Sequence, residues 1–437
     1  FMAKKIEKFA GLILVVGLLF SLGYVFFRDK WDLANSEHPS ASVLTKLAKE
    51  IISGEKVFLV LFQNNMELRP GGGFIGSFAI IKTENGKVKS YAVHDTSNFD
   101  GRIPENDQMP APMKKIFKIN AWKLRDSNYS PDYPTNAQKA LDFYYQGQGK
   151  EKFDGVIAVN AAVLESILKI TGPIRLAGYP NIFEADSALL TLEKQVEIDY
   201  AQQGIEQGER KDVMNVFLRE LLKKSVELSK LDKLKLAKKL IGQLKNKNIQ
   251  LYFVNSNLQK LAQEGQWDGV MDASWDKDYL MVVDANLGAY KSDYYVKRSL
   301  MYTVDLTKEI PEAILKITYN HTGKEKNWMT RDYLTYLRIY MPKGSRINEF
   351  SESGEIAYGE EFNKKFAGGF VKVPINSVKT VEIKYTLPKE LKTAEYKLKI
   401  QKQSGSGVVP AKISVKLPGG EIKNFDLELN GDEIINL

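Results

Sequence analysis

The stretch 56-KVFLVLFQNNMELRPGGGFIGSFAIIKTENGKVKSYAVHD-95 decides which fold the first half of the chain adopts. Its glycines match the G-x-G-x-x-G pattern of dinucleotide-binding sites, and Asp95 follows at about the expected distance. Such a site needs a helix directly after the glycines, with its N-terminus facing the pyrophosphate. Here FIGSFAII follows, and the Asn-Gly pair at 85–86 predicts a hairpin. The dinucleotide fold is therefore rejected, and the missing Gly-Lys-Ser/Thr excludes a P-loop.

The composition indicates folded protein and narrows the chemistry. The chain has 437 residues, 43% of them hydrophobic, with a net charge of +8. This modest charge includes no arginine-rich run, so nucleic acid is not an expected partner. The absence of cysteine excludes disulfides, thiolate zinc sites and a cysteine nucleophile. Three histidines leave little material for a multi-histidine metal site or a Ser-His-Asp triad.

The N-terminal segment predicts a membrane anchor. Residues 10–27 carry no charge, and about eighteen apolar residues are just enough to span a bilayer as a helix. Lysines precede this run, which places the N-terminus in the cytoplasm and the rest of the chain outside. A cleaved signal peptide is the alternative, but the run ends in aromatic rather than small residues. We therefore expect a single-pass cell-membrane protein whose bulk is extracytoplasmic.

Three regions follow from the hydrophobic patterning: a cytoplasmic stub and transmembrane anchor at 1–31, an extracytoplasmic α/β domain at 32–290, and a β-sandwich at 291–437. In the second region, strands at 56–63, 77–95, 154–160, 249–254 and 279–286 alternate with helices at 43–52, 135–146 and 161–171 and a helical stretch at 186–246. In the third, short strands of period two run without helices, which predicts an immunoglobulin-like sandwich.

Two segments carry the candidate site residues. Arg69 beside Gly71, Gly72 and Gly73 belongs either to a tight turn with the arginine in solvent, or to a site where the bare backbone admits an anion that Arg69 binds. Residues 101–135 are expected to form a long surface loop, in which aromatic residues alternate with polar ones. The candidate ligand-binding residues there are Arg102, Lys123, Arg125, Asp126, Asn128 and Asp132. Asp95 and Asp126 are the expected Mg²⁺ ligands.

The motifs ELRPGGGFIGS, WKLRDSNYSPDYP, FDGVIAVN with ITGPI, and MVVDANLGAYKSDYYVKR resemble a bacterial family, domain of unknown function 4012, over roughly residues 55–400. The order of elements is also similar to the LytR-CpsA-Psr proteins, which transfer glycopolymers from polyprenyl pyrophosphate to the cell wall. That second resemblance implies a LytR-CpsA-Psr-like α/β domain in which Arg69 and Asp95 are catalytic. It departs from the family pattern at Gly71 and His94, which stand where an aspartate and an arginine are expected.

Two functions are therefore expected. The first is a membrane-anchored envelope protein that binds or transfers a polyprenyl-(pyro)phosphate-linked glycan, with Mg²⁺ and arginines holding the pyrophosphate. The second is a non-catalytic surface, adhesion or assembly protein. The expected partners are the bilayer, a lipid-linked glycan or cell-wall polymer, and a further copy of the chain.

Overall fold

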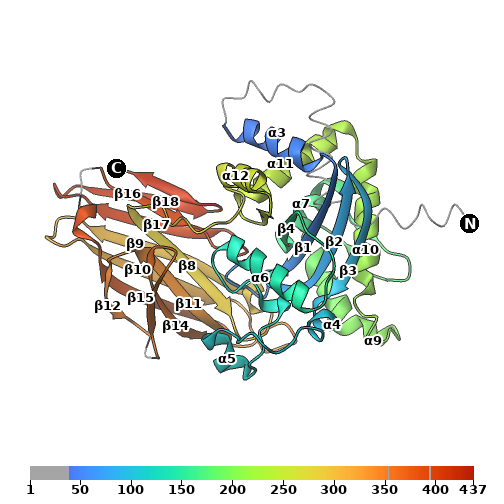
Figure 1. Ribbon diagram of the computed structural model, residues 1–437. Helices are drawn as coiled ribbons and strands as arrows, with labels where there is room; N and C mark the ends of the chain where they lie inside the picture. The colour runs from blue at the N-terminus through green and yellow to red at the C-terminus, as the bar shows by residue number, and fades with distance from the viewer. Residues whose placement is uncertain (1–38, 353, 393–394) are drawn as a thin grey trace, which may run out of the picture.

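The computed structural model describes residues 39–352, 354–392 and 395–437. Figure 1 shows two parts lying side by side, an α/β part formed by the first half of the chain and a β-rich part formed by the second. The predicted span at 10–27 lies outside the described residues. Among the residues that the structure does describe, no helix is long and apolar enough to cross a membrane.

A mixed sheet forms the centre of the α/β part, in the order β3-β2-β1-β4-β7. Only β1 and β4 run parallel; the other neighbours are antiparallel. The five strands are β1 (Glu55–Asn64), β2 (Phe74–Glu84), β3 (Lys87–Asp95), β4 (Gly155–Asn160) and β7 (Ile249–Phe253). Side chains alternate across the sheet, so Phe58 and Val60 of β1 enter one apolar core while Leu59 and Leu61 enter another.

Helices cover both faces of this sheet. One face is packed mainly by α3 (Pro39–Ile51), α7 (Ala161–Thr171), α8 (Ala188–Lys194), α10 (Asp212–Glu227), α11 (Lys230–Lys245) and α12 (Ser256–Glu264). The other face carries α6 (Tyr133–Gln146) with α4 (Thr96–Asp100), and α6 lies between the sheet and the β-rich part (Figure 1). Shorter elements complete this part: α5 (Ala111–Phe117), η3 (Leu124–Asp126), β5 (Ile174–Arg175), β6 (Ile182–Phe183), η4 (Gln195–Asp199) and α9 (Tyr200–Gln202).

The β-rich part is a sandwich of two six-stranded sheets that share one apolar core. The first sheet has the order β12-β15-β10-β9-β17-β18, and its strands are β12 (Arg346–Phe350), β15 (Ser377–Thr386), β10 (Glu312–His321), β9 (Val296–Asp305), β17 (Val409–Lys416) and β18 (Ile422–Leu429). The second has the order β13-β14-β11-β8-β16-β19, and its strands are β13 (Ala357–Glu361), β14 (Lys364–Val373), β11 (Tyr333–Pro342), β8 (Asp278–Asn286), β16 (Lys397–Gln401) and β19 (Glu433–Asn436). Short 3-10 turns, η5 (Ser292–Tyr294) and η6 (Lys389–Leu391), lie in its connections.

The β-hairpin predicted from the Asn-Gly pair at 85–86 is confirmed. β2 and β3 are antiparallel, and they are joined by Asn85 and Gly86 with φ angles of 48° and 73°. Positive φ at both central residues is the requirement of a type I′ turn, whose twist matches that of the flanking strands. The predicted helix at 161–171 is also confirmed. It begins after Asn160, whose side chain accepts from the Ala162 N–H, and it ends at Gly172 with φ 77°.

Three expectations about organisation need correction. The segment 279–286 was assigned to the α/β domain, but as β8 it pairs with β11 and β16 inside the sandwich. The expected surface loop at 101–135 contains α5 and η3 and buries Met113 and Leu124 completely. The sandwich has two parallel strand pairs and two six-stranded sheets, whereas immunoglobulin-like domains have seven to nine antiparallel strands, so that finer assignment is not confirmed.

Candidate functional site

Arg69 is buried where three segments of the chain meet. Its side chain is 3% exposed. Its Nε donates to Asp126 Oδ1 at 3.0 Å, and its Nη1 donates to the carbonyl oxygen of Asn286 at 2.8 Å. The guanidinium also lies over the ring of Phe74, 5.4 Å from the centroid. Arg69 therefore joins the β1–β2 loop to η3 and to the end of β8, and its Nε and Nη1 already have protein partners.

The glycines at 71–73 lie in a crowded place rather than beside an open cleft. A Cβ added at Gly71 would lie 2.3 Å from Asn136 Nδ2, and one at Gly72 would lie 2.0 Å from Gln63 Oε1. A Cβ at Gly73 would lie 2.5 Å from the Asn64 carbonyl. Protein atoms thus occupy the space beside these glycines in which the sequence predicted an anion. These glycines permit close packing of backbone and side chains.

Asn128 and Asp132 are also held by the fold. Asn128 is fully buried, and its Nδ2 donates to the carbonyl of Gly73 at 2.6 Å. Asp132 caps the N-terminus of α6, because its Oδ2 accepts from the Thr135 N–H at 3.0 Å. Its other oxygen accepts from the Met271 N–H at 2.9 Å. Asp132 is therefore the N-cap residue of α6.

The other cations of this region lie apart from Arg69. Arg125 is partly exposed and pairs with Asp100, which is 2% exposed. Lys123 donates to the carbonyl of Ile103. Arg102 is exposed and lies over the ring of Phe99. The cations that the sequence predicted to bind one ligand together thus each contact a different part of the protein.

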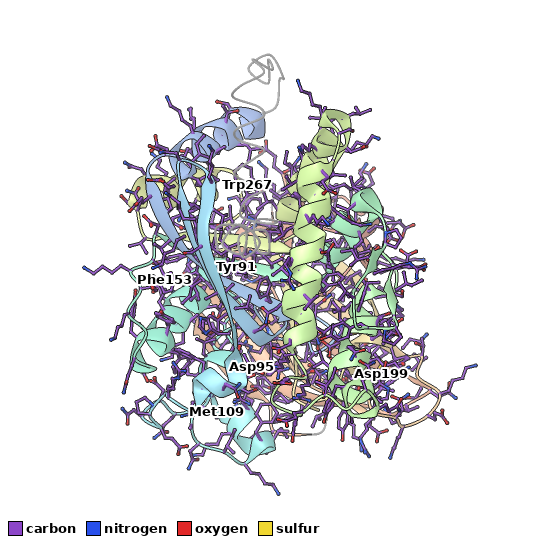
Figure 2. The ribbon with its side chains drawn as sticks, turned by 90° about the vertical axis from the view of Figure 1, so that its right-hand side faces the viewer. Tyr91, Asp95, Met109, Phe153, Asp199 and Trp267 are labelled. Atoms are coloured by element: carbon purple, nitrogen blue, oxygen red, sulfur yellow. The ribbon has the colours of Figure 1, made fainter. Side chains whose placement is uncertain are left out.

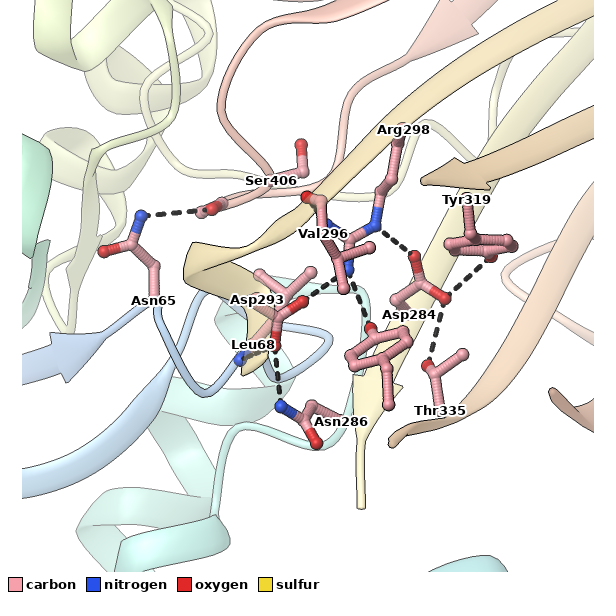
Figure 3. A network of polar contacts seen from close by, with 12 residues as sticks. Asn65, Leu68, Asp284, Asn286, Asp293, Val296, Arg298, Tyr319, Thr335 and Ser406 are labelled. Atoms are coloured by element: carbon pink, nitrogen blue, oxygen red, sulfur yellow. Dashed lines mark hydrogen bonds and ion pairs between the residues drawn. The ribbon is translucent and has the colours of Figure 1, made fainter. Parts of the chain in front are cut away.

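A polar network continues the junction between the two parts of the chain (Figure 3). Arg298 donates through Nε to Asp284 at 2.7 Å, and its Nη2 pairs with Asp293. Asp293 in turn accepts from the Leu68 N–H at 2.9 Å, one residue before Arg69. Tyr319 donates to the second oxygen of Asp284 at 2.9 Å. The segment around Arg69 is therefore anchored in the polar interior of the sandwich.

Asp95 lies at the end of β3 and forms an ion pair with Lys211. It caps α4 by accepting from the Ser97 N–H at 2.7 Å, and its Oδ2 lies 2.8 Å from Lys211 Nζ. Burial alone would raise the pKa of Asp95, but the bonds from Lys211 and from backbone N–H groups outweigh it and lower the pKa. Lys211 also donates to the carbonyl of Gly76 at 3.1 Å, at the wall of a cavity.

This cavity lies between the sheet and the helices α7, α8 and α10. Its volume is about 230 Å³, close to the ~300 Å³ at which small-ligand pockets begin. Its walls are mainly apolar, and they include Phe62, Phe74, Val159, Ile167, Phe217 and Leu221. Such walls suit an apolar group, since burial away from water stabilises it.

The charged residues of the cavity gather near the C-terminal ends of the parallel strands β1 and β4. Lys291 Nζ lies 3.2 Å from Glu67, 3.3 Å from Glu193 and 3.9 Å from Glu197. Burial raises the pKa of Glu193, and Lys291 offsets this only in part. Burial would lower the pKa of Lys291, but the three carboxylates outweigh it and raise the pKa. In open α/β sheets, ligands commonly bind outside the carboxyl ends of the strands.

We define the charged rim as Glu67, Glu193, Glu197, Lys211 and Lys291. It combines two cations with three carboxylates, all of which lie within 4 Å of Lys291 Nζ. Sequence reasoning missed it, because its members come from the β1–β2 loop, from the α8–η4 segment, from the start of α10 and from the segment after β8. In the sequence they resemble ordinary solvated charges between apolar helix positions. Only the topology of the chain brings them together.

The expected magnesium ligands do not fit a shared metal site. Asp95 is engaged by Lys211, and Asp126 by Arg69. Throughout the ranges that the structure describes, no three His, Cys, Asp or Glu side chains are placed to hold a metal ion. The magnesium site stays a prediction from the sequence, and no step below depends on it.

Comparisons with known proteins add one family. Residues 53–196 match the family model described as "Protein of unknown function (DUF4012)", so the match ends in η4, well before the predicted limit near 400. No curated protein matches the chain. Among solved structures, the X-ray structure of the Lin1025 protein from Listeria innocua is similar at 11% identity and a TM-score of 0.26, covering 49% of this chain and 79% of that one. The resemblance to the DUF4012 family that the sequence motifs predict is thus shown for residues 53–196.

Proposed function

We propose that this is a membrane-anchored, extracytoplasmic envelope protein that binds a polyprenyl-phosphate-linked glycan, with part of the lipid chain in the cavity between the sheet and α10. The observation that carries this proposal is the pairing of apolar walls with a charged rim that contains Lys211 and Lys291. A polyprenyl phosphate has the same division into an apolar chain and an anionic head. The similarity in element order to the LytR-CpsA-Psr proteins supports the same ligand class.

The head group is assigned to the charged rim rather than to Arg69. Arg69 is 3% exposed and bonded to Asp126 and Asn286, whereas Lys211 and Lys291 line the cavity. An arriving phosphate must compete with Glu193 for Lys291. Because burial already raises the pKa of Glu193, proton uptake by this carboxyl is the favoured way to relieve the repulsion.

The sequence left open whether the protein binds a lipid-linked glycan or also transfers it. The geometry around Arg69 and Asp95 supports binding rather than transfer. Transfer by the expected route needs an arginine that can reach the leaving pyrophosphate. Arg69 is instead buried and bonded to Asp126 and Asn286 at the junction between the two halves of the chain. Asp95 is tied to Lys211 and to the start of α4. We therefore assign both residues a positioning role.

The test is a calorimetric titration of the purified full chain in detergent with farnesyl phosphate and with farnesol. We expect farnesyl phosphate to bind at least ten-fold more tightly than farnesol, because only the phosphate engages Lys211 and Lys291. Met214→Trp, which fills the cavity, should weaken binding at least ten-fold. Met301→Trp, at a residue that is 47% exposed on the sandwich, is the matched control and should change nothing.

Equal affinity for farnesol and farnesyl phosphate would contradict the role of the rim. Unchanged affinity in Met214→Trp would contradict the assignment of the cavity.

A second candidate function, surface assembly, is favoured by the edge strands of the sandwich. β18 and β19 each end a sheet, and they expose Ile422 and Ile434 at 55% and 47%. Unpaired strand edges with exposed apolar side chains are sites of pairing with other chains. Sedimentation of the full chain tests this: concentration-dependent assembly that Ile422→Lys abolishes would support it, and a monomer at all concentrations would refute it.

A further inference from the structure

The turn between α10 and α11 is both basic and apolar. We call residues 223–235 the α10–α11 tip; they read KKSVELSKLDKLK. Five lysines and two acidic residues give the tip an excess of three positive charges. Lysines and leucines interleaved on a helix pair are typical of segments that lie on membrane surfaces.

Two large apolar side chains at the tip face water. Val226 is 58% exposed and Leu231 is 61% exposed, on either side of the turn. The same helices bury Leu222 and Leu236 completely, so the core positions of both helices are already filled by other residues. Val226 and Leu231 are therefore additional to the stripe that packs on the sheet.

The tip lies at the same end of the molecule as α3, the first helix that the structure describes. α10 begins next to Asp95, through the Lys211 ion pair, and its sixteen residues carry the chain about 24 Å away to the tip. Figures 1 and 2 show α3 and the far end of α10 at the same end of the molecule, with Asp95 at the other end of the sheet. α3 begins at Pro39, and the eleven residues between it and the predicted span at 10–27 can reach at most ~40 Å.

We propose that the α10–α11 tip docks on the surface of an anionic lipid bilayer, with Val226 and Leu231 entering the headgroup layer while the lysines face the lipid phosphates. The chemistry of the tip selects this partner: clustered lysines attract anionic headgroups, and adjacent apolar side chains anchor a helix in the interface. The proposal rests on the membrane location within the proposed function. It does not depend on the ligand of the cavity.

Docking at the tip orients the cavity as well. The charged rim lies near the start of α10, and the apolar wall extends along that helix through Phe217 to Leu221, toward the tip. A lipid held in the cavity would then have its head directed away from the bilayer surface.

The absence of cysteine allows a direct test on the full chain. Leu231→Cys carries an environment-sensitive fluorophore, and the protein is reconstituted into nanodiscs that contain phosphatidylglycerol or only phosphatidylcholine. We expect the label to be at least two-fold brighter in anionic discs and to be quenched by nitroxide-labelled lipids. Val378→Cys is the matched control, because Val378 is 65% exposed in the sandwich, and its label should show neither effect.

A charge-reversed variant completes the test. Adding Lys223→Glu and Lys233→Glu to the Leu231→Cys chain should return the label to the brightness of the Val378 control. Equal signals at the two labelled sites would overturn the proposal, and so would equal signals in the two kinds of disc. A bright label that lipid nitroxides do not quench would show burial against another protein and would also overturn it.

Two further outcomes separate this proposal from the proposed function. If the chain does not enter nanodiscs, the membrane location fails and both fall. If the tip signal is present and persists in Met214→Trp while farnesyl phosphate does not bind the wild-type chain, only the cavity assignment fails.

Discussion

Arg69 holds a positive charge almost out of contact with water, and its carboxylate partner Asp126 is itself 7% exposed. Removing one member of a buried ion pair leaves the other charge without compensation, which typically costs about 3–5 kcal/mol of stability. We expect Arg69→Ala to lower the free energy of unfolding by that amount. Urea denaturation of the full chain in detergent, followed by circular dichroism, measures this.

Arg102→Ala is the control for Arg69→Ala, because Arg102 is exposed and should contribute less than about 1 kcal/mol through its contact with Phe99. If Arg69→Ala left stability unchanged but abolished binding of farnesyl phosphate, Arg69 would be a ligand residue after all.

Glu193 gives the rim a dependence on pH. Because burial raises its pKa, Glu193 is protonated as the pH falls through a range above that of an exposed glutamate. Protonation frees Lys291 for a phosphate, so binding of farnesyl phosphate should tighten as the pH is lowered. Glu193→Gln should bind several-fold more tightly at pH 8 and lose most of the pH dependence, as a calorimetric series from pH 8 down to pH 5 would measure. A variant that kept the wild-type pH profile would contradict this role.

Sequence reasoning about single residues singled out Arg69 and the glycines beside it, but it could not show that Arg69 is buried. Arg69 and the glycines at 71–73 are special, but their exposure depends on β8 and on the loop near Gln403, which lie far away in the chain. Gln403 donates to the carbonyl of Arg69 at 3.0 Å. Residue type and spacing carry no signal for such a contact. The rim lysines were missed for the same reason.

At the scale of elements, the β1–β2 loop crosses the segment after β16 so closely that side chains do not fit. Gly405 and Gly407 both have positive φ, 78° and 72°. A Cβ on Gly405 would lie 2.0 Å from the carbonyl oxygen of Gly72, whereas one on Gly407 would meet nothing within 4 Å. Gly407→Ala should therefore cost only the strain of its backbone, about 1 kcal/mol. Gly405→Ala should cost clearly more, because it also separates the two loops.

Thermal unfolding of the two glycine variants measures this difference. Equal losses would show that the crossing is loose and that backbone strain alone decides both positions.

Elements with local signals could be predicted, and elements without them could not. The Asn85-Gly86 turn and α7 were predictable because their turn and cap residues are encoded nearby. β12, β13 and β19 are four or five residues long at the edges of the sandwich, and partners distant in the chain hold them there. β8 looks like a strand of the α/β part because it follows β7, and only its pairing with β11 and β16 moves it into the sandwich.

At the scale of the whole molecule, the junction of the two parts contains a lysine with a strongly perturbed pKa. Burial lowers the pKa of Lys402 to about 7 from 10.5, and the nearby Lys247 adds to this, while Asp432 opposes it. Between these two pH values the unfolded chain binds a proton that the folded chain does not. Stability should therefore rise with pH from about 7.5 to 9.5, by at most about 1.4 kcal/mol per pH unit from this group.

Lys402→Met should remove that slope, and urea unfolding at pH 7.5 and pH 9.5 measures it. Lys372→Met, at an exposed lysine paired with Asp332, should retain it. Identical slopes in the two variants would show that Lys402 does not titrate in this range.

The mixed α/β fold with a β-rich C-terminal region could be predicted from the change of hydrophobic period near residue 290. The way in which the two parts join could not. Arg298, Asp284 and Asp293 form a buried network that continues to Leu68, yet these residues look like ordinary strand polar residues in the sequence. Because this network buries the segment around Arg69, the predicted anion site is part of the junction between the two parts. The cavity beside α10 is therefore the candidate site.

Photo-cross-linking shows where on the protein a polyprenyl phosphate binds. The purified full chain in detergent is irradiated with a polyprenyl phosphate that carries a benzophenone at the end of its chain, and the modified peptides are identified by mass spectrometry. We predict cross-links on α7 and α10, around Ile167 and Leu218, which excess farnesyl phosphate suppresses. Cross-links concentrated at 69–73 and 122–132, or none above the level of Met214→Trp, would contradict binding of the lipid chain in the cavity beside α10.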